Sequence, residues 1–327
     1  MEFKSSHRDP FSLSPVGWNY ACAARGLHAG PRGGELGRLR YVAFRDADGR
    51  ACVLDARCSH MGTYLDKGSV ANGKLRCPLH GWEYAGDGRC TSVPASPVIP
   101  PFACQTVFPT TELGGHVLFY NAPIARFPMP FFDGVSVDDL LPAEPFELSG
   151  DVPWYMIGAN AFDAQHFNMA HDRKIVGQPV VDSPSPFARR ISATYEVGGQ
   201  TVRDRLTRKF SGPLVRMSIT VWGGPLVLVT AAFARTTSYG MVLVRPIAPN
   251  RTRFRVIVWV PRRKNAAARS AIDPLDASIR RRFIRAFLEQ DTAKAGGACY
   301  NPATLIDADQ ELRGYFDWLA TVAPAEK

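Results

Sequence analysis

The sequence predicts an α+β protein in two parts, a small antiparallel β domain over residues 1–125 and a larger domain over 126–327 whose antiparallel sheet is flanked by helices. Three observations predict this class. A chain of 327 residues is long for one domain and comfortable for two. Up to about Tyr120, short runs rich in β-branched and aromatic residues alternate with Gly, Asp and Asn turn signals. Farther along, longer strand-like runs give way to helical spacing from Pro274.

The first domain is expected to consist of short strands joined by turns. The runs that predict strands are 40–44, 51–54, 74–75 and 116–120. His116 lies within a strand pattern and away from any motif, so we interpret it as structural. The stretch 122–130 is rich in proline and cannot continue a central strand, which makes it the expected seam between the domains.

The second domain is expected to hold one large sheet and two helical regions. The predicted strands are 191–197, 202–210, 215–222, 226–233, 240–246 and 253–260, with a Gly198-Gly199 turn after the first. A helix-like stretch ends near His171. A second helix begins near Pro274 and carries an apolar stripe formed by Leu275, Ile279, Phe283, Ile284, Phe287 and Leu288.

Composition narrows the functional classes. The net charge of +9 could attract nucleic acid or an acidic partner, but the basic residues are scattered and no nucleic-acid motif is present. The densest basic cluster, Arg280–Arg282 with Arg285, is expected to be a solvated helix face, with docking of an acidic electron donor as the alternative. No apolar run approaches the ~20 residues needed to span a bilayer, and the first ten residues carry no secretion signal.

A cytoplasmic location is expected by default. The chain has seven cysteines, and five of them follow no regular pattern, which is typical of buried thiols in a reducing compartment. These five are Cys22, Cys52, Cys90, Cys104 and Cys299.

Two short blocks, Cys58-Ser-His60 and Cys77-Pro-Leu-His80, supply two thiolates and two imidazoles. This set suits a two-iron, two-sulfur cluster in which two Cys hold one iron and two neutral His hold the other. A structural zinc site is the alternative, but zinc ligand pairs usually sit two to four residues apart, whereas Cys58 and His60 are separated by one. The blocks, followed by Gly81-Trp82-Glu-Tyr84, resemble Rieske-type iron-sulfur domains.

The Rieske resemblance implies details beyond the four ligands. Respiratory Rieske proteins carry an extra Cys in each half and join the two in a disulfide. This chain has Thr63 and Leu79 at the corresponding positions, which is similar to the lower-potential domains of ferredoxins and oxygenases. Trp82 and Tyr84 are candidates for packing over the cluster and donating hydrogen bonds to it, or else are ordinary strand aromatics.

A second motif, Asn160-Ala-Phe-Asp163-Ala-Gln-His166 with His171, gathers ligand-type side chains within twelve residues. Two His and one carboxylate form the facial triad that binds ferrous iron and leaves positions open for dioxygen. The alternative is two unrelated His, since such spacings are weak on their own. The segment resembles the N-x2-D-x2-H-x4-H motif of Rieske non-haem iron oxygenases, the oxygenase components of aromatic-ring and ketosteroid hydroxylases.

That resemblance assigns the remaining roles. It points to Asp291 as the third iron ligand, and Asp291 independently falls on the apolar stripe of the last helix, where a buried carboxylate needs a partner or a metal. The fallback candidates are Glu289, Asp307 and Asp309. The resemblance places Asn160 next to the ligands. It makes Asp163 a bridge between His166 and a Rieske histidine of a neighbouring subunit in a homotrimer.

The expected function is that of a terminal oxygenase. It would use O2, with electrons from NAD(P)H supplied by a separate reductase or ferredoxin, because no nicotinamide or flavin signature is present. The expected substrate is an apolar, aromatic or polycyclic small molecule, most simply hydroxylated by mono- or dioxygenation. The same iron site also supports demethylation, desaturation or amine oxidation. A Rieske electron carrier without oxygenase activity and a zinc-stabilised scaffold are the rivals from other classes.

The substrate pocket is expected among the strands of the second domain. The candidate lining residues, each of which could instead be ordinary core, are Trp154, Phe162, Phe167, Met169, Trp222, Phe233 and Met241.

Overall fold

The computed structural model describes residues 11–324 and divides the chain into two compact units. The first, here the N-terminal unit, is Val16–Met129. The second, here the C-terminal unit, begins at Pro130 and includes the described residues before Val16. Both units are built on antiparallel sheets, and helices are concentrated in the C-terminal unit, so the predicted α+β class is confirmed.

The N-terminal unit contains three small sheets, with strand orders β1-β11-β10, β2-β3-β4-β9 and β5-β6-β7-β8. The strands are β1 Trp18–Ala23, β2 Arg32–Leu36, β3 Leu39–Arg45, β4 Ala51–Asp55, β5 Ser69–Ala71, β6 Lys74–Arg76, β7 Glu83–Tyr84, β8 Cys90–Ser92, β9 Val107–Phe108, β10 Thr110–Leu113 and β11 His116–Tyr120. All four strand predictions for this part are confirmed, because each falls inside β3, β4, β6 or β11. His116 is buried in β11.

One antiparallel sheet dominates the C-terminal unit, in the order β12-β19-β18-β17-β16-β15-β14, with β13 also paired to β19. The strands are β12 Leu140–Pro142, β13 Phe146–Gly150, β14 Arg173–Ser185, β15 Ala188–Val197, β16 Leu214–Trp222, β17 Leu226–Phe233, β18 Thr237–Ala248 and β19 Arg251–Pro261. Consecutive strands from β14 to β19 pair with each other as in a meander, with α3 inserted between β15 and β16.

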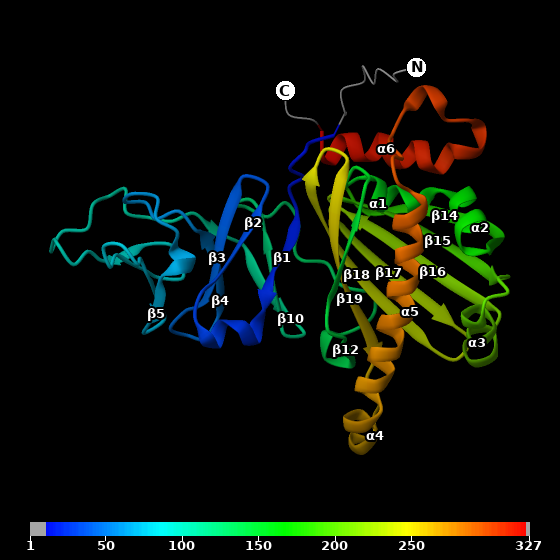
Figure 1. Ribbon diagram of the computed structural model, residues 1–327, viewed down its shortest axis with the longest axis horizontal. Coiled ribbons are helices and arrows are strands. Elements are labelled where there is room, and N and C mark those ends of the chain that lie inside the picture. Colours follow the sequence, from blue (N-terminus) through cyan, green and yellow to red (C-terminus); the bar gives the residue numbers. More distant parts are fainter. Residues whose placement is uncertain (1–10, 325–327) are drawn as a thin grey trace. The chain divides into compact units, whose positions relative to one another are not determined.

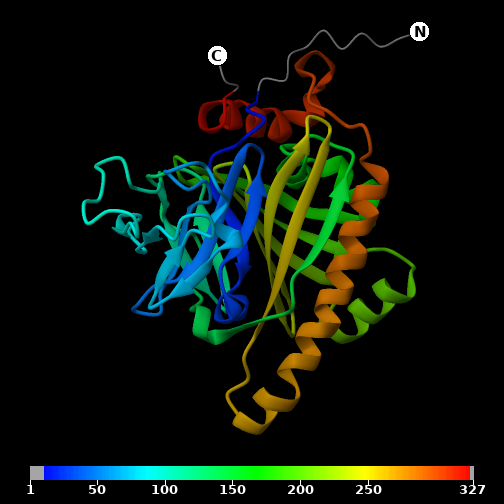
Figure 2. The ribbon, with the colours of Figure 1, turned by 60° about the vertical axis from the view of Figure 1, so that its left-hand side comes forward.

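Helices of the C-terminal unit lie against this sheet and at its ends. They are α1 Met156–Ala159, α2 Ala164–His171, α3 Val202–Ser211, α4 Ala266–Ala271, α5 Asp273–Lys294 and α6 Gln310–Val322. The long helix α5 runs across one face of the sheet (Figure 1), and Figure 2 shows the same crossing from another side. It starts with Pro274 and two acidic residues in its first turn, both favourable at a helix N-terminus.

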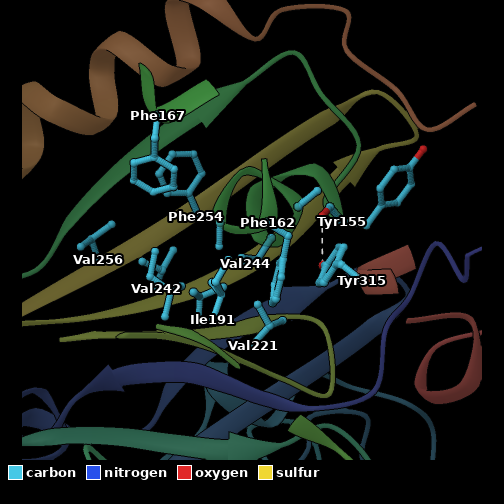
Figure 3. Packing of buried hydrophobic residues seen from close by; sticks show 14 of the residues in the cluster. Tyr155, Phe162, Phe167, Ile191, Val221, Val242, Val244, Phe254, Val256 and Tyr315 are labelled. Atoms are coloured by element: carbon cyan, nitrogen blue, oxygen red, sulfur yellow. Dashed lines mark hydrogen bonds between the residues drawn. The ribbon is translucent and has the colours of Figure 1, made fainter. Parts of the chain in front are cut away.

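The core of the C-terminal unit lies between the sheet and the helices α1, α2 and α6. Figure 3 shows part of this cluster, in which Phe162 stacks on Tyr315 with ring centroids 4.8 Å apart. The Tyr315 hydroxyl donates to the Tyr155 carbonyl at 3.2 Å, so this buried polar group is satisfied. The segment that leads into α2 is therefore held in place by packing against the core.

The predicted strand 202–210 is wrong, because these residues form the helix α3. The Thr201 side chain accepts a hydrogen bond from the Asp204 N–H at 3.1 Å and caps the helix. The apolar residues Val202, Leu206 and Phe210 are spaced four apart, and the positions midway between them are the charged Asp204 and Arg208, which suits a helix and not an alternating strand.

The expectation of buried thiols is wrong for two cysteines, since Cys104 and Cys299 are exposed. Cys22 and Cys52 are half-buried, and Cys90 is buried. Within residues 11–324, no helix combines the length and the apolar character that crossing a membrane requires.

Candidate metal centres and an adjoining cavity

The blocks that carry Cys58 and Cys77 form two loops of matching geometry in the N-terminal unit. In each loop the cysteine carbonyl accepts a hydrogen bond from a glycine N–H four residues later, Gly62 at 2.8 Å and Gly81 at 3.1 Å. Both glycines have φ of +72°, a conformation that costs other residues energy. The sequence therefore builds the same tight turn twice.

Within these loops the sulfurs point inward and the imidazoles lie outside. Cys58 and Cys77 are each 3% exposed, whereas His60 and His80 are exposed, with ring centroids 4.7 Å apart. His60 stacks on Trp82 at 4.5 Å with an interplanar angle of 3°. Burial raises the pKa of the Cys77 thiol, so a thiolate at this position requires a cation as partner.

Tyr84 supports the buried side of the loops. Its hydroxyl lies 3.1 Å from Cys58 Sγ and 3.0 Å from Ser59 Oγ. Burial and the neighbouring Cys58 both raise the pKa of Tyr84, so the phenol keeps its proton and can donate it. Tyr84 thus contacts the ligand loop through its hydroxyl, and donation to a bound cluster stays a prediction. Two buried sulfurs and two surface imidazoles fit the mixed ligation of a Rieske cluster.

In the C-terminal unit, the helix α2 carries both histidines of the second motif. Asp163 caps the helix, because its side chain accepts from the His166 N–H at 2.9 Å. His171 is the last residue of α2, and Asp172 ends the helix in the left-handed region with φ of +51°. The two imidazole rings lie 5.1 Å apart although five residues separate them.

Asp291 on α5 meets these histidines. Its Oδ1 lies 3.0 Å from His166 Nε2 and 2.6 Å from His171 Nε2. Among residues 11–324, these three form the one group of His, Cys, Asp or Glu side chains whose ligand atoms lie within 4.8 Å of one another. Two of the fallback carboxylates have other partners, since Glu289 pairs with Arg285 and Asp309 accepts from Gln165.

The chemistry of this group fits a divalent cation. Burial opposes ionisation of Asp291, but the hydrogen bond with His166 and the close approach of His171 outweigh it and lower the pKa of the carboxyl. His171 Nε2 is buried and, despite its short distance to Asp291, makes no hydrogen bond of acceptable geometry with the described residues. Its ring is held by stacking on Phe287 at 3.7 Å. Lone pairs of two nitrogens and one oxygen that converge in a buried site are what a metal ion requires.

Further contacts fix the end of α2. Arg173 donates to the His171 carbonyl at 2.9 Å and pairs with Asp204 of α3 at 2.8 Å. Lys294 of α5 donates to the Ala170 carbonyl at 2.9 Å. Sequence reasoning missed Arg173 and Asp204. The Thr201-x-x-Asp204 capping pattern could have revealed α3, but no local signal links Arg173 to the ligand helix.

A cavity of about 600 Å³ adjoins the three candidate ligands. Its walls are mostly apolar side chains from α5, α3 and the strands β16 to β19, and Asn160 also lines it. Of the predicted lining residues, Phe167 and Phe233 are confirmed. The others do not line the cavity: Trp154, Phe162 and Met241 are buried in the core, Trp222 is half-buried elsewhere, and Met169 is 79% exposed.

Much of the apolar stripe of α5 faces this cavity, although Ile284 and Leu288 also pack against the core. Ile279, Phe283 and Phe287 line the cavity together with Asp291. The expectation of a solvated basic face is wrong for Arg280, which also lines the cavity. Its side chain is 17% exposed and pairs with Asp276 at 2.7 Å.

Comparison with known proteins agrees with the first of these centres. Residues 17–103 match the Rieske [2Fe-2S] domain. The oxygenase subunit of a tert-butanol monooxygenase / tert-amyl alcohol desaturase from Aquincola tertiaricarbonis is 31% identical over 163 residues, which cover 49% of this chain and 35% of that protein. The oxygenase component of a 3-ketosteroid-9-alpha-monooxygenase from Rhodococcus rhodochrous is 33% identical over 115 residues, 35% of this chain and 30% of that protein.

The matched segments thus span about a third of these curated relatives. The solved structure of Pseudomonas putida CBB5 NdmA with caffeine extends the likeness in fold, with a TM-score of 0.70 at 19% identity over 92% of this chain and 89% of that one. The fold and the ligand sets define a Rieske-domain protein with a second candidate metal centre. Residues 17–103 form a Rieske [2Fe-2S] domain, and the chain is similar to proteins named as oxygenase components, which agrees with the resemblance noted in the sequence.

Proposed function

We propose that the chain is a terminal oxygenase that oxidises, in the simplest case hydroxylates, an apolar small molecule. One observation carries the proposal. A Rieske ligand set and a buried group of two His and one carboxylate occur in the same chain, and the second group borders an apolar cavity. O2 is the co-substrate. Electrons come from NAD(P)H through a separate reductase or ferredoxin.

In this proposal residues 1–125 carry the electron store and residues 126–327 carry the oxygen chemistry. Four side chains hold the [2Fe-2S] cluster, namely Cys58, His60, Cys77 and His80. A second set, His166, His171 and Asp291, holds one Fe(II), which when bound supplies the activation of dioxygen. Thiolate ligands, and thiols with no disulfide among the described residues, favour a cytoplasmic location.

The residues around the proposed iron site have distinct tasks. Asp291 supplies negative charge, and the lowered pKa of its carboxyl keeps it ionised. Stacking on Phe287 keeps the His171 ring from turning away from the site. The apolar walls exclude bulk water, which would otherwise compete for open coordination positions and quench reactive species. Asn160 lies at the cavity wall and can position a bound molecule.

We further propose that copies of the chain form a homotrimer in which Asp163 links His166 to a Rieske histidine of the next subunit. Asp163 is half-buried, and one of its oxygens accepts the His166 N–H. A carboxylate between two metal-bound imidazoles gives short charge-assisted hydrogen bonds, which provide a path for an electron.

Iron and sulfide analysis tests the proposal. The purified protein is expected to contain about three irons and two sulfides per chain, following the cluster and mononuclear stoichiometry. Asp291→Ala should lose the mononuclear iron and keep the Rieske spectrum, while Glu289→Ala, altered in a neighbouring carboxylate on the same helix, should keep all three irons. Two irons in the unaltered protein would support the electron-carrier rival, and a colourless zinc protein would support the scaffold.

Activity then needs a direct assay. A candidate substrate screen with a surrogate reductase and 18O2, followed by mass spectrometry, should give a product with one or two labelled oxygens. A demethylated or desaturated product would support the proposed oxygen chemistry but show that the reaction is not hydroxylation. No substrate-dependent oxygen consumption with any apolar compound, in a protein with full iron, would contradict the proposal.

A further inference from the structure

The cavity is long because it follows the helix α5. One face of this helix lines it from Asp276 through Arg280, Phe283 and Phe287 to Asp291. These residues are spaced three or four apart, as they must be to share a face. The fifteen steps from Asp276 to Asp291 correspond to a rise of about 22 Å along the axis.

The sheet gives an independent measure of the same length. Alternate residues of β17, from Val227 to Phe233, line the cavity, and the six steps between these two residues span about 20 Å. Ser238 and Val242 line it on the neighbouring strand β18. Arg280 donates to Ser238 Oγ at 2.5 Å, so the end at Phe233 and Ser238 is the end remote from Asp291.

That remote end is polar but electrically balanced. Arg280 pairs with Asp276 at 2.7 Å, and Asp276 also lies 3.5 Å from Arg263. Arg263 in turn pairs with Asp273 at 2.6 Å, so two basic and two acidic side chains compensate one another. Ser238 accepts from Arg280 and still has its own O–H to donate. A neutral oxygen can form a hydrogen bond there. A carboxylate or an ammonium group would find no free opposite charge with which to pair.

The cavity opens near this polar end. Leu206 and Phe210 of α3 and Ile279 of α5 line it and are 40%, 62% and 47% exposed. A ligand that enters here passes its apolar end inward first. Its polar end then stops beside Ser238, and its far carbon reaches the three candidate metal ligands.

We infer that the cavity binds an elongated, mostly apolar molecule with an uncharged hydroxyl or keto oxygen at one end, and that oxidation occurs at the opposite end. This inference rests on the proposed function for the site of oxidation. Straight-chain alcohols and rigid fused-ring alcohols share the required chemistry. The experiment separates them.

Gly240 allows the cavity to be blocked midway. It lines the cavity between Ser238 and Val242 on β18, and a Cβ added there would meet only Val229 Cβ at 3.7 Å, an ordinary contact. Gly240→Val should therefore fold and divide the cavity. Met241→Leu is the matched control, since Met241 is fully buried, does not line the cavity and changes little in volume.

Binding is measured by calorimetry on the iron-loaded full chain without turnover. The probes are 1-hexanol, 1-decanol and 1-tetradecanol, tetradecanoate, and a tetracyclic steroid alcohol. Affinity in the alcohol series should rise about fourfold for each added methylene. Tetradecanoate should bind at least tenfold more weakly than 1-tetradecanol. Ser238→Ala should weaken the alcohols by about two- to tenfold through loss of one hydrogen bond.

Gly240→Val should abolish binding of 1-tetradecanol or of the steroid alcohol and leave 1-hexanol unchanged, and Met241→Leu should bind all probes normally. Either long probe behaving this way supports the inference and identifies its type. Long probes that bind Gly240→Val as well as the parent protein, or a preference for tetradecanoate, overturn it. A protein that binds the long probes but never oxidises them contradicts the proposed function alone, and one that oxidises only compact molecules contradicts the inference alone.

Discussion

Removal of the Tyr84 hydroxyl is expected to lower the reduction potential of the Rieske cluster. Cys58 as an iron ligand is a thiolate and can only accept, so the Tyr84 O–H at 3.1 Å must donate to it, and Ser59 donates to Tyr84. Reduction adds negative charge to the cluster and its sulfurs. A donor to sulfur therefore stabilises the reduced form more than the oxidised form.

The size of the shift follows from the energy of this one bond. A hydrogen bond to a charged acceptor contributes about 1.5–3 kcal/mol. If about half of that differs between the two oxidation states, and 1.4 kcal/mol corresponds to 59 mV for one electron, Tyr84→Phe should lower the potential by about 30–60 mV. Burial and Cys58 raise the pKa of Tyr84, so the shift should be the same across neutral pH.

Spectroelectrochemical titration of the visible Rieske bands measures the potential directly. Tyr41→Phe is the matched control, because the Tyr41 hydroxyl donates to the Ala21 carbonyl at 3.1 Å in the same unit. Its potential should equal that of the parent protein. A Tyr84→Phe protein with intact cluster absorption and a potential within about 10 mV of the parent would refute the assignment of Tyr84 as donor, given the expected shift.

Three further outcomes follow from single side chains. Asp163→Asn keeps the helix cap, since Asn caps as well as Asp, but it removes the charge. Stopped-flow reoxidation of the Rieske cluster should therefore slow more than tenfold while stability stays normal. Asp163→Ala should slow reoxidation and also lower the free energy of unfolding by about 0.5–2 kcal/mol. Burial opposes ionisation of Asp204, but Thr201 and Arg173 outweigh it and lower the pKa of this carboxyl. The stabilisation that Asp204 gives the folded state is therefore complete above its unfolded pKa near 4 and is lost as pH falls through its lower folded pKa. Acid unfolding followed by circular dichroism should show a weaker dependence of stability on pH in Asp204→Asn. Gly224→Ala combines φ of +103° with a Cβ placed 2.8 Å from the Trp154 ring, so it should lower the free energy of unfolding, measured in urea, by about 2–4 kcal/mol. Gly134→Ala also has a positive φ but meets no neighbouring atom, so it should lower this free energy by about 1 kcal/mol. Equal losses in the two glycine variants, or wild-type reoxidation in Asp163→Asn, would contradict these readings.

Local chemistry made the metal motifs predictable. The cluster requires its ligands at fixed distances from one another. This requirement sets both the spacing of Cys58, His60, Cys77 and His80 in the sequence and the shape of the loops that carry them. Asp291 was predictable for a different reason. A carboxylate on an apolar helical stripe needs a buried partner, and the structure brings it to His171.

Tertiary context made other features unpredictable from sequence. An apolar stripe on a helix indicates that water is excluded, but it does not say whether a core or a cavity lies opposite, and Phe283 and Phe287 border the cavity. The long strand β14 also had no clear signal, because Gly177 and Pro179 interrupt it, which an edge strand tolerates. The prediction of a strand at 202–210 is wrong because Val202, Leu206 and Phe210, four residues apart, share one face of a strand as well as of a helix.

The helix α2 shows how packing and ligand geometry depend on each other. Eight residues are too few for a stable helix in isolation, so its shape must come from contacts outside it. The Asp163 side chain accepts a hydrogen bond from a backbone N–H in the first turn of α2. Arg173 and Lys294 donate hydrogen bonds to backbone carbonyls in its last turn. Since Lys294 lies three residues after Asp291 on α5, the helix that supplies the carboxylate also holds the end of the helix that supplies the imidazoles. The three candidate ligands therefore depend together on the packing of α2 against α5, and a change that separates these helices should disrupt all three.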